Sequence, residues 1–168
     1  LHKSKLIQPL FVSDSNPEKQ SITTMPGQFI HSRDSLFFEI DELQKLGINT
    51  IALFPNISQA KKDNNGTEAL NPDNFMCKLV SEIKARFNEV VLVTDVALDP
   101  YTTTGHDGII ENKDVDNDKT LKALEEMSVN LASAGSDIIA PSDMMDGRVG
   151  KIRKKLEEAN LKDTIILS

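Results

Sequence analysis

The sequence predicts an α/β protein with a parallel sheet, built either as an open doubly wound sheet or as part of a (βα)8 barrel. Short runs of apolar, often β-branched residues alternate with longer segments of helical periodicity. The apolar runs are continuous, which is typical of parallel strands buried on both faces. Polar clusters follow the strands, whereas the turns that precede the strands are short. Both architectures place ligand sites at that carboxyl edge.

The order of these segments predicts strands and helices in strict alternation, joined by right-handed crossovers. Strands are expected at residues 6–12, 48–54, 90–95, 137–142 and 164–168. Helices are expected at residues 34–47, 72–87, 120–135 and 147–160. Segments 13–33 and 55–70 are polar and are expected to be long loops. A whole barrel typically needs about 250 residues, so this chain would supply about five strands and four helices.

Helix ends follow from capping chemistry. The expected N-caps are Ser32 or Asp34 for the first helix, Asn71 with Pro72 behind it for the second, and Asp116 or Asn117 for the third. Gly47 and Gly135 suit the left-handed position after a helix.

Composition excludes several classes of partner. The 168 residues carry a formal net charge of −7, with no basic run that would attract nucleic acid or an anionic membrane. No apolar stretch approaches the roughly 20 residues of a membrane helix. Cys77 is the only cysteine, so a thiolate zinc site cannot form within the chain. We expect one cytoplasmic domain over residues 1–168.

Ionisable side chains crowd the segment VLVTDVALDPYTTTGHDG at 91–108. Val93 and Asp95 share one face of the strand, and Ala97 and Asp99 would continue it if the chain stayed extended. Such a wall can hold a hard cation, bind an ammonium group or move protons. Alternatively, Asp95 caps one turn and the Asp99-Pro pair opens another. The spacing alone leaves both interpretations open.

The remaining candidates are weaker when taken singly. His106 in GHDG fits a structural turn better than a catalyst, and Asp107 beside it is ambiguous. Ser142 lacks the G-x-S-x-G elbow of a nucleophile and is better interpreted as a ligand-binding hydroxyl. Arg148 would pair with a carboxylate of its own loop rather than clamp a bound acid. Cys77 stands among apolar residues and is expected in the core.

Five segments together resemble one known family in its own order. They are LIQPLFV, MPGQ, TDVALDPYTTTGHDGII, VDNDKTLKALEEMSVNLASAGSDIIAPSDMMDGRV and KDTIILS. These segments resemble porphobilinogen synthase, also called δ-aminolevulinic acid dehydratase, over essentially the whole chain. The resemblance implies a (βα)8 barrel of tetrapyrrole (heme) biosynthesis. Such an enzyme, a lyase, condenses two molecules of 5-aminolevulinate to porphobilinogen with loss of water.

The resemblance also implies roles for individual residues. Asp95 and Ser142 match positions of the substrate pocket, and Asp99 and Asp107 are expected to face the active site with Asp95 as catalytic groups. The positions of Ala97, Asp99 and Asp107 are cysteines in the zinc-dependent branch. Their replacement by Ala, Asp and Asp indicates the aspartate-rich branch, in which Asp99 and Asp107 would hold Mg²⁺ or K⁺ through oxygen. Arg148 would belong to a regulatory or subunit-contact region.

The family's Schiff-base lysines lie beyond the strand that matches TIILS, so the resemblance implies the N-terminal half of the enzyme. These 168 residues alone are expected to be inactive, and the homo-octamer of the family is doubtful for them. The alternative is a self-sufficient doubly wound domain that binds Mg²⁺ as a signalling or binding module, with Asp95 as phospho-acceptor.

Overall fold

The centre of the fold is a mainly parallel sheet. The computed structural model describes residues 2–168. Its strands are β1 (Ile7–Ser13), β2 (Gln20–Ser21), β3 (Phe29–His31), β4 (Thr50–Asn56), β5 (Val91–Asp95), β6 (Ile110–Glu111), β7 (Asp114–Val115), β8 (Ile138–Ala140) and β9 (Ile165–Ile166). Its helices are η1 (Lys3–Lys5), α1 (Arg33–Lys45), η2 (Gln59–Lys61), α2 (Thr67–Leu70), α3 (Phe75–Arg86), α4 (Asn117–Ala134) and α5 (Arg148–Glu158).

Strand order decides between the two predicted architectures. Across residues 2–168 the main sheet has seven strands in the order β2-β3-β1-β4-β5-β8-β9, and β1, β4, β5, β8 and β9 are parallel neighbours. A doubly wound sheet reverses its order at a switch point. Here every main crossover advances in the same direction, as in a (βα)8 barrel. The doubly wound alternative is therefore wrong.

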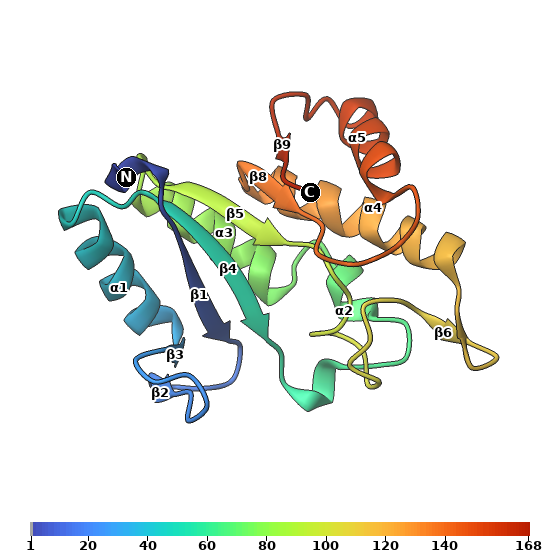
Figure 1. Ribbon diagram of the computed structural model, residues 1–168, viewed down its shortest axis with the longest axis horizontal. Coiled ribbons are helices and arrows are strands. Elements are labelled where there is room, and N and C mark those ends of the chain that lie inside the picture. The colour runs from blue at the N-terminus through green and yellow to red at the C-terminus, as the bar shows by residue number, and fades with distance from the viewer. Residues whose placement is uncertain (1) are drawn as a thin grey trace.

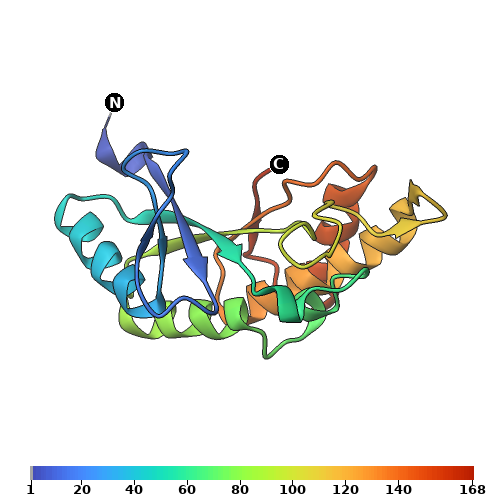
Figure 2. The same cartoon turned by 90° about the horizontal axis from the view of Figure 1, so that it is seen from below.

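The helices lie on one side of a curved sheet (Figure 1). In Figure 2, α1, α3 and α4 form an arc along the lower side with the strands above them. Right-handed crossovers that all advance in one direction require this arrangement. The prediction that both faces are buried is wrong for the described residues. In β4, Ile51 and Leu53 on the helix side are buried, whereas Ala52 and Phe54 on the other face are only half-buried.

The core lies between the sheet and the helices. Strand residues on the helix side, such as Val12, Ile51 and Leu53, are fully buried. They belong to one cluster with the apolar stripes of the helices, which include Leu36, Ile40, Leu79, Val80, Ile83, Leu124 and Leu131. The five predicted strands and four predicted helices are all present, with ends shifted by a few residues. The periodicity of apolar residues was sufficient to find them because each element buries one continuous stripe.

The two predicted long loops contain short elements. Segment 13–33 forms β2 and β3, and β3 pairs parallel to β1 through Phe11–Ile30 and Val12–His31. Segment 55–70 forms η2 and α2, and the antiparallel pair β6–β7 precedes α4. Strands of two or three residues carry too little periodicity to be found in a sequence.

Capping geometry confirms two predictions and corrects one. Ser32 caps α1, and the Asp116 carboxylate accepts the Lys119 N–H at 2.9 Å to cap α4. The predicted cap at Asn71 is wrong, because Asn74 caps α3 by accepting the Cys77 N–H at 2.9 Å. Pro72 lies instead in the turn closed by the bond from Asn74 N–H to the Asn71 carbonyl.

Gly135 ends α4 in the left-handed conformation, with φ of 115°, as predicted. Within residues 2–168, no helix has the length and apolar character needed to cross a bilayer.

Replacing Leu124, which is 0% exposed, by alanine tests this packing. We expect the free energy of unfolding to fall by about 2–5 kcal/mol, since the side chain leaves a cavity in the core. Met144→Ala is the control, because this side chain is 77% exposed and its loss should change the value by about 0.5 kcal/mol or less. Urea denaturation measures both, and equal midpoints for the two variants would contradict the assigned core.

Candidate functional site

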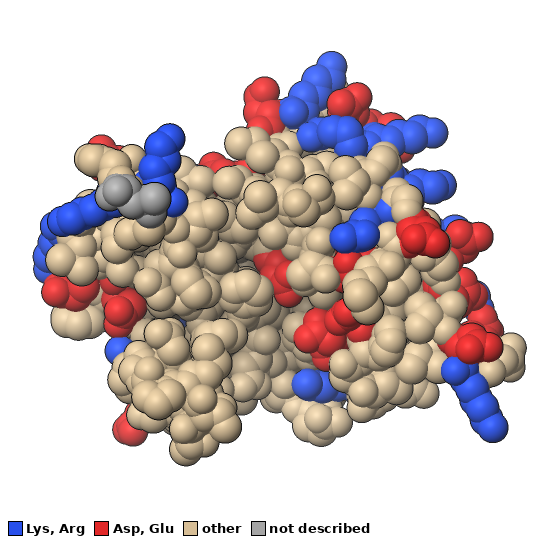
Figure 3. Space-filling view, in the orientation of Figure 1, with Lys and Arg blue, Asp and Glu red and all other residues tan. Residues whose placement is uncertain are grey.

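Polar side chains gather at the edge where the parallel strands end. β5 delivers Asp95 to this edge, and Asp95 pairs in register with Ala140 of β8. The loop after β8 begins with Pro141 and Ser142. Acidic side chains lie near the middle of the face seen in Figure 3. The sheet topology therefore brings together two loops, one after Asp95 and one after Ala140, that are far apart in sequence.

Of the acids at this edge, Asp95 has the pKa that is shifted most. Burial, as the main cause, raises its pKa from 3.8 to about 6. The negative charges of Asp99, Asp107 and Asp143 raise this pKa further, whereas the side chain of Ser142 partly offsets the rise. A carboxyl group with a pKa near 6 can both give and take a proton close to neutral pH.

Asp99 does not continue the face of β5, because the strand ends at Asp95. It opens a turn in which the N–H groups of Tyr101 and Thr102 both bond to the Leu98 carbonyl at 2.9 Å. Burial and the charge of Asp107 raise the pKa of Asp99, and the Lys62 ammonium group opposes that rise. The turn therefore brings Asp99 back within electrostatic range of Asp95.

The loop after β4 is joined to the loop after β5. The Asp63 N–H donates to the Tyr101 carbonyl at 3.2 Å, and the Thr103 N–H donates to the Asp63 carbonyl at 3.0 Å. Side chains add a bond from the Thr103 hydroxyl to Asn64 at 2.5 Å. These bonds hold the loop that carries Lys62 against the loop that carries Asp99.

A buried aspartate at the end of β1 holds the loop after β4 in place. Asp14, whose side chain is 2% exposed, accepts from the Ser58 N–H at 2.8 Å and lies 3.0 Å from the Lys61 ammonium group. Hydrogen bonds and the Lys61 charge lower the pKa of Asp14 despite its burial. Lys61 is therefore committed to an ion pair, and Lys62 is the lysine of this loop that faces Asp99.

Lys62 and Asp99 line a cavity of about 320 Å³ at the carboxyl ends of β1 and β4. The remaining lining is mostly apolar and comprises Phe11, Ile22, Ile30, Pro55, Asn56, Ile57 and Pro100. A cavity with apolar walls and a few charged groups is typical of small-molecule sites.

The loop after β8 carries an ion pair between a buried aspartate and a partly exposed arginine, next to Ser142. The Asp143 side chain is 0% exposed, and its Oδ2 lies 3.5 Å from Arg148 Nε. Arg148 therefore pairs with a carboxylate of its own loop, as expected. Its predicted role in regulation or subunit contact stays a prediction. Asp143 forms, with Asp95, Asp99 and Asp107, a group of four aspartates that we call the acid cluster. The sequence did not single out Asp143, because its neighbours in sequence do not show that it is buried.

His106 and Cys77 have structural surroundings, as predicted. His106 Nδ1 accepts the Gly108 N–H at 3.0 Å, within the turn that holds Asp107. Cys77 is 3% exposed, and burial raises its thiol pKa to about 11. A thiol with this pKa is a poor nucleophile at neutral pH.

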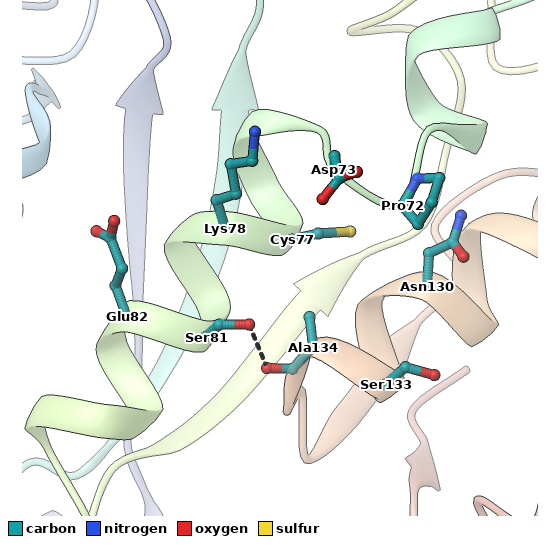
Figure 4. Close-up of a pocket in the computed structure, with 9 residues that line it drawn as sticks. All are labelled: Pro72, Asp73, Cys77, Lys78, Ser81, Glu82, Asn130, Ser133 and Ala134. Atoms are coloured by element: carbon teal, nitrogen blue, oxygen red, sulfur yellow. Dashed lines mark hydrogen bonds between the residues drawn. The ribbon is translucent and has the colours of Figure 1, made fainter.

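A groove of about 450 Å³ lies between α3 and α4 (Figure 4). Its lining comprises Pro72, Asp73, Cys77, Lys78, Ser81, Glu82, Asn130, Ser133 and Ala134. The Ser81 hydroxyl is occupied by a bond to the Ala134 carbonyl at 3.0 Å. The groove is larger than the cavity at Lys62, but it contains none of the perturbed carboxylates.

The residues present fit a hydrated cation better than a complete metal cage. Within residues 2–168, no three His, Cys, Asp or Glu side chains are placed to hold one metal ion together. Asp99 and Asp107 are close enough for their charges to interact. Such a pair can supply one or two oxygen ligands to Mg²⁺, which commonly keeps several waters.

Comparison with known proteins accounts for this arrangement. The family model described as delta-aminolevulinic acid dehydratase matches residues 1–168. The chain belongs to the delta-aminolevulinic acid dehydratase family. It is 44% identical to the Chlamydia pneumoniae enzyme of that name over 168 residues, which is all of this chain and 51% of that protein. It is 45% identical to the Bradyrhizobium diazoefficiens enzyme over 163 residues, covering 97% of this chain and 46% of that protein.

A solved structure supports the same family. The Toxoplasma gondii delta-aminolevulinic acid dehydratase (porphobilinogen synthase), in complex with its reaction product porphobilinogen, superposes with a TM-score of 0.97 at 40% identity. The match covers 99% of this chain and 48% of that chain. The chain thus spans about half the length of the dehydratases it matches. Its sheet is the corresponding part of their (βα)8 barrel, which confirms the predicted fold class.

The raised pKa of Asp95 predicts a pH-dependent stability. Between pH 3.8 and about 6 the folded protein holds a proton at Asp95 that the unfolded chain has released. The contribution of this group is therefore complete below pH 3.8 and is lost as the pH rises through 6. Asp95→Asn has no carboxyl group at this position and so lacks this dependence. As the pH rises from 3.8 to about 6, the free energy of unfolding of the variant minus that of the parent should therefore increase by up to about 3 kcal/mol.

Urea denaturation of both proteins at several pH values measures the difference. Asp146→Asn is the control, because Asp146 is exposed in the loop after β8. A stability difference between Asp95→Asn and the parent that stays flat from pH 4 to pH 7 would contradict the assigned burial of Asp95.

Proposed function

We propose that this chain forms the aspartate-bearing part of a porphobilinogen synthase, which condenses two molecules of 5-aminolevulinate with loss of water. The observation that carries the proposal is the likeness to a solved relative that holds porphobilinogen, with a TM-score of 0.97 over 99% of this chain. The polar edge of the sheet agrees with it, since barrel enzymes bind substrates at the carboxyl ends of their strands.

Asp95 is the proposed proton-transfer group. A condensation that releases water requires protons to be removed and delivered, and a pKa of about 6 suits a group that does both near neutral pH. The charge of the ionised carboxylate also attracts the ammonium group of 5-aminolevulinate. Ser142, beside Asp95, is proposed to bind substrate through its hydroxyl group, and Asp99 and Asp107 would complete the acidic wall.

The Schiff-base lysines of the family are expected outside residues 1–168. We therefore infer that a polypeptide of these residues alone does not turn substrate over. The proposed oligomer and the cytoplasmic location stay predictions.

Substitution in the full-length protein tests the roles of Asp95 and Ser142. Asp95→Asn should lower kcat for porphobilinogen formation by about 10²-fold or more, because asparagine cannot transfer a proton. Ser142→Ala should raise KM by about tenfold through the loss of one hydrogen bond. Asp73→Asn in the outer groove is the control and should leave both constants within about twofold. A parent protein that forms no porphobilinogen would refute the proposed function.

We also propose that Asp99 and Asp107 together hold a hydrated Mg²⁺ or K⁺ ion. The support is that their charges interact and that each can offer oxygen ligands. When bound, such a cation would polarise a substrate oxygen.

Calorimetric titration with Mg²⁺ or K⁺ alone tests this site. Asp99→Asn and Asp107→Asn should each weaken binding about tenfold or more, because each removes one of two anionic ligands. Asp146→Asn should leave the affinity unchanged, since its exposed carboxylate lies outside the pair. Equal affinities in all four proteins would show that the cation binds elsewhere.

A further inference from the structure

The loop after β8, residues 141–148, contains polar atoms that the proposed chemistry does not use. Asp143 is fully buried, and its Oδ2 has no hydrogen-bond partner although it lies 3.5 Å from Arg148 Nε. Arg148 Nε also lacks a partner, while its Nη1 donates to the Met145 carbonyl at 3.2 Å. A buried carboxylate is costly unless it is paired. A loop that only reversed the direction of the chain would not need a buried carboxylate paired with an arginine.

Asp143 fixes the backbone of its own loop. Its Oδ1 accepts the Met145 N–H at 2.7 Å. Arg148 binds the carbonyl of the same residue, so the pair holds Met145 from both sides of its backbone. The Asn117 side chain, at the start of α4, then holds the backbone of Asp146: its Oδ1 accepts the Asp146 N–H at 2.9 Å, and its Nδ2 donates to the Asp146 carbonyl at 3.3 Å. The Asp146 carboxylate takes no part in these bonds. The loop is consequently tied both to itself and to α4.

The fixed loop touches the acid cluster at two points. Ser142, the residue before Asp143, follows Ala140 by two residues, and Ala140 is the partner of Asp95 in the register of β5 and β8. Met145 packs against Gly108, the residue after Asp107, so closely that a Cβ built on Gly108 would lie 3.1 Å from the Met145 Cε atom. A displacement of the loop would therefore change the surroundings of both Asp95 and Asp107.

We propose that the Asp143–Arg148 pair is a positioning device for the acid cluster. It keeps Ser142 beside Asp95 and keeps Met145 against the turn that carries Asp107. Neither residue is proposed to touch substrate. This inference rests on the proposed function only for its kinetic consequence, because the positioning itself is a property of the loop.

Kinetics of the full-length protein give the first test. Asp143→Asn keeps the shape and the acceptor for the Met145 N–H but leaves Arg148 without its counter-charge. We expect kcat to fall about 10- to 100-fold with KM within about threefold, since a small misplacement of reacting groups slows the chemical step most. Asp146→Asn, in the same loop but exposed, should leave both constants within twofold. The double variant Asp143→Asn/Arg148→Gln restores a neutral pair and should regain at least tenfold of the lost kcat.

A merely structural role would lower the melting temperature of Asp143→Asn without this split between kcat and KM, and without recovery in the double variant. That result would overturn the proposal. If Asp143→Asn does not fold, Arg148→Lys replaces it, because lysine keeps the charge but cannot reach both Asp143 and the Met145 carbonyl in the same way. It should lower kcat at least fivefold, and an unchanged kcat would refute the pair's role.

Crystal structures of the parent, Asp143→Asn and Asp146→Asn separate this inference from the proposed function. The positioning role predicts that Ser142 moves away from Asp95 in Asp143→Asn and stays in place in Asp146→Asn. An unmoved Ser142 in both variants would overturn the inference even if the protein makes porphobilinogen. A displaced Ser142 would support it even if another reaction is found.

Discussion

The burial of Asp95 at the end of a parallel strand is the constraint on which the rest of the site depends. β5 lies between β4 and β8, and its backbone hydrogen bonds place this carboxyl group at the sheet edge regardless of the charge it carries. Desolvation then raises its pKa to about 6. Burial of the ionised carboxylate lowers the stability of the folded protein, but it also produces a group that exchanges protons near neutral pH.

Several acids share this small region, and the chain limits their mutual repulsion in different ways. Asp14 has an ion pair with Lys61, and Asp143 lies beside Arg148. Burial raises the pKa of Asp99, and the positive charge of Lys62 reduces that rise. At Asp95, the side chain of Ser142 offsets part of the effect of burial. The pKa of Asp95 remains raised to about 6, so this carboxyl group can change its protonation near neutral pH.

Rigid connections between loops maintain this balance. The ladder through Asp63 ties the loop after β4 to the loop after β5, and Met145 ties the loop after β8 to Gly108. Each loop would be mobile if it were held only by its own strand. Cross-connections turn three loops into one surface, which is what proton transfer between fixed groups requires. The family relationship agrees with this organisation, since the same part of a solved relative superposes closely.

The sequence by itself determined the alternation of strands and helices, the carboxyl edge as the place for chemistry and, through its motifs, the family. These features are encoded in runs of apolar residues and in two long loops that each lie within one stretch of chain. The start of α3 was misplaced by a few residues because Asn71 and Asn74 are equally good N-caps locally, and β2 and β3 were too short to recognise. The roles of Asp143 and Lys62 were not visible, because an aspartate in a turn and a lysine in a polar loop have the same local sequence whether buried or exposed. Only the tertiary structure decided the strand order, the curvature of the sheet with its helices on one side, and the position of the 141–148 loop next to the end of β5. These depend on contacts between residues far apart in sequence, which no local pattern records.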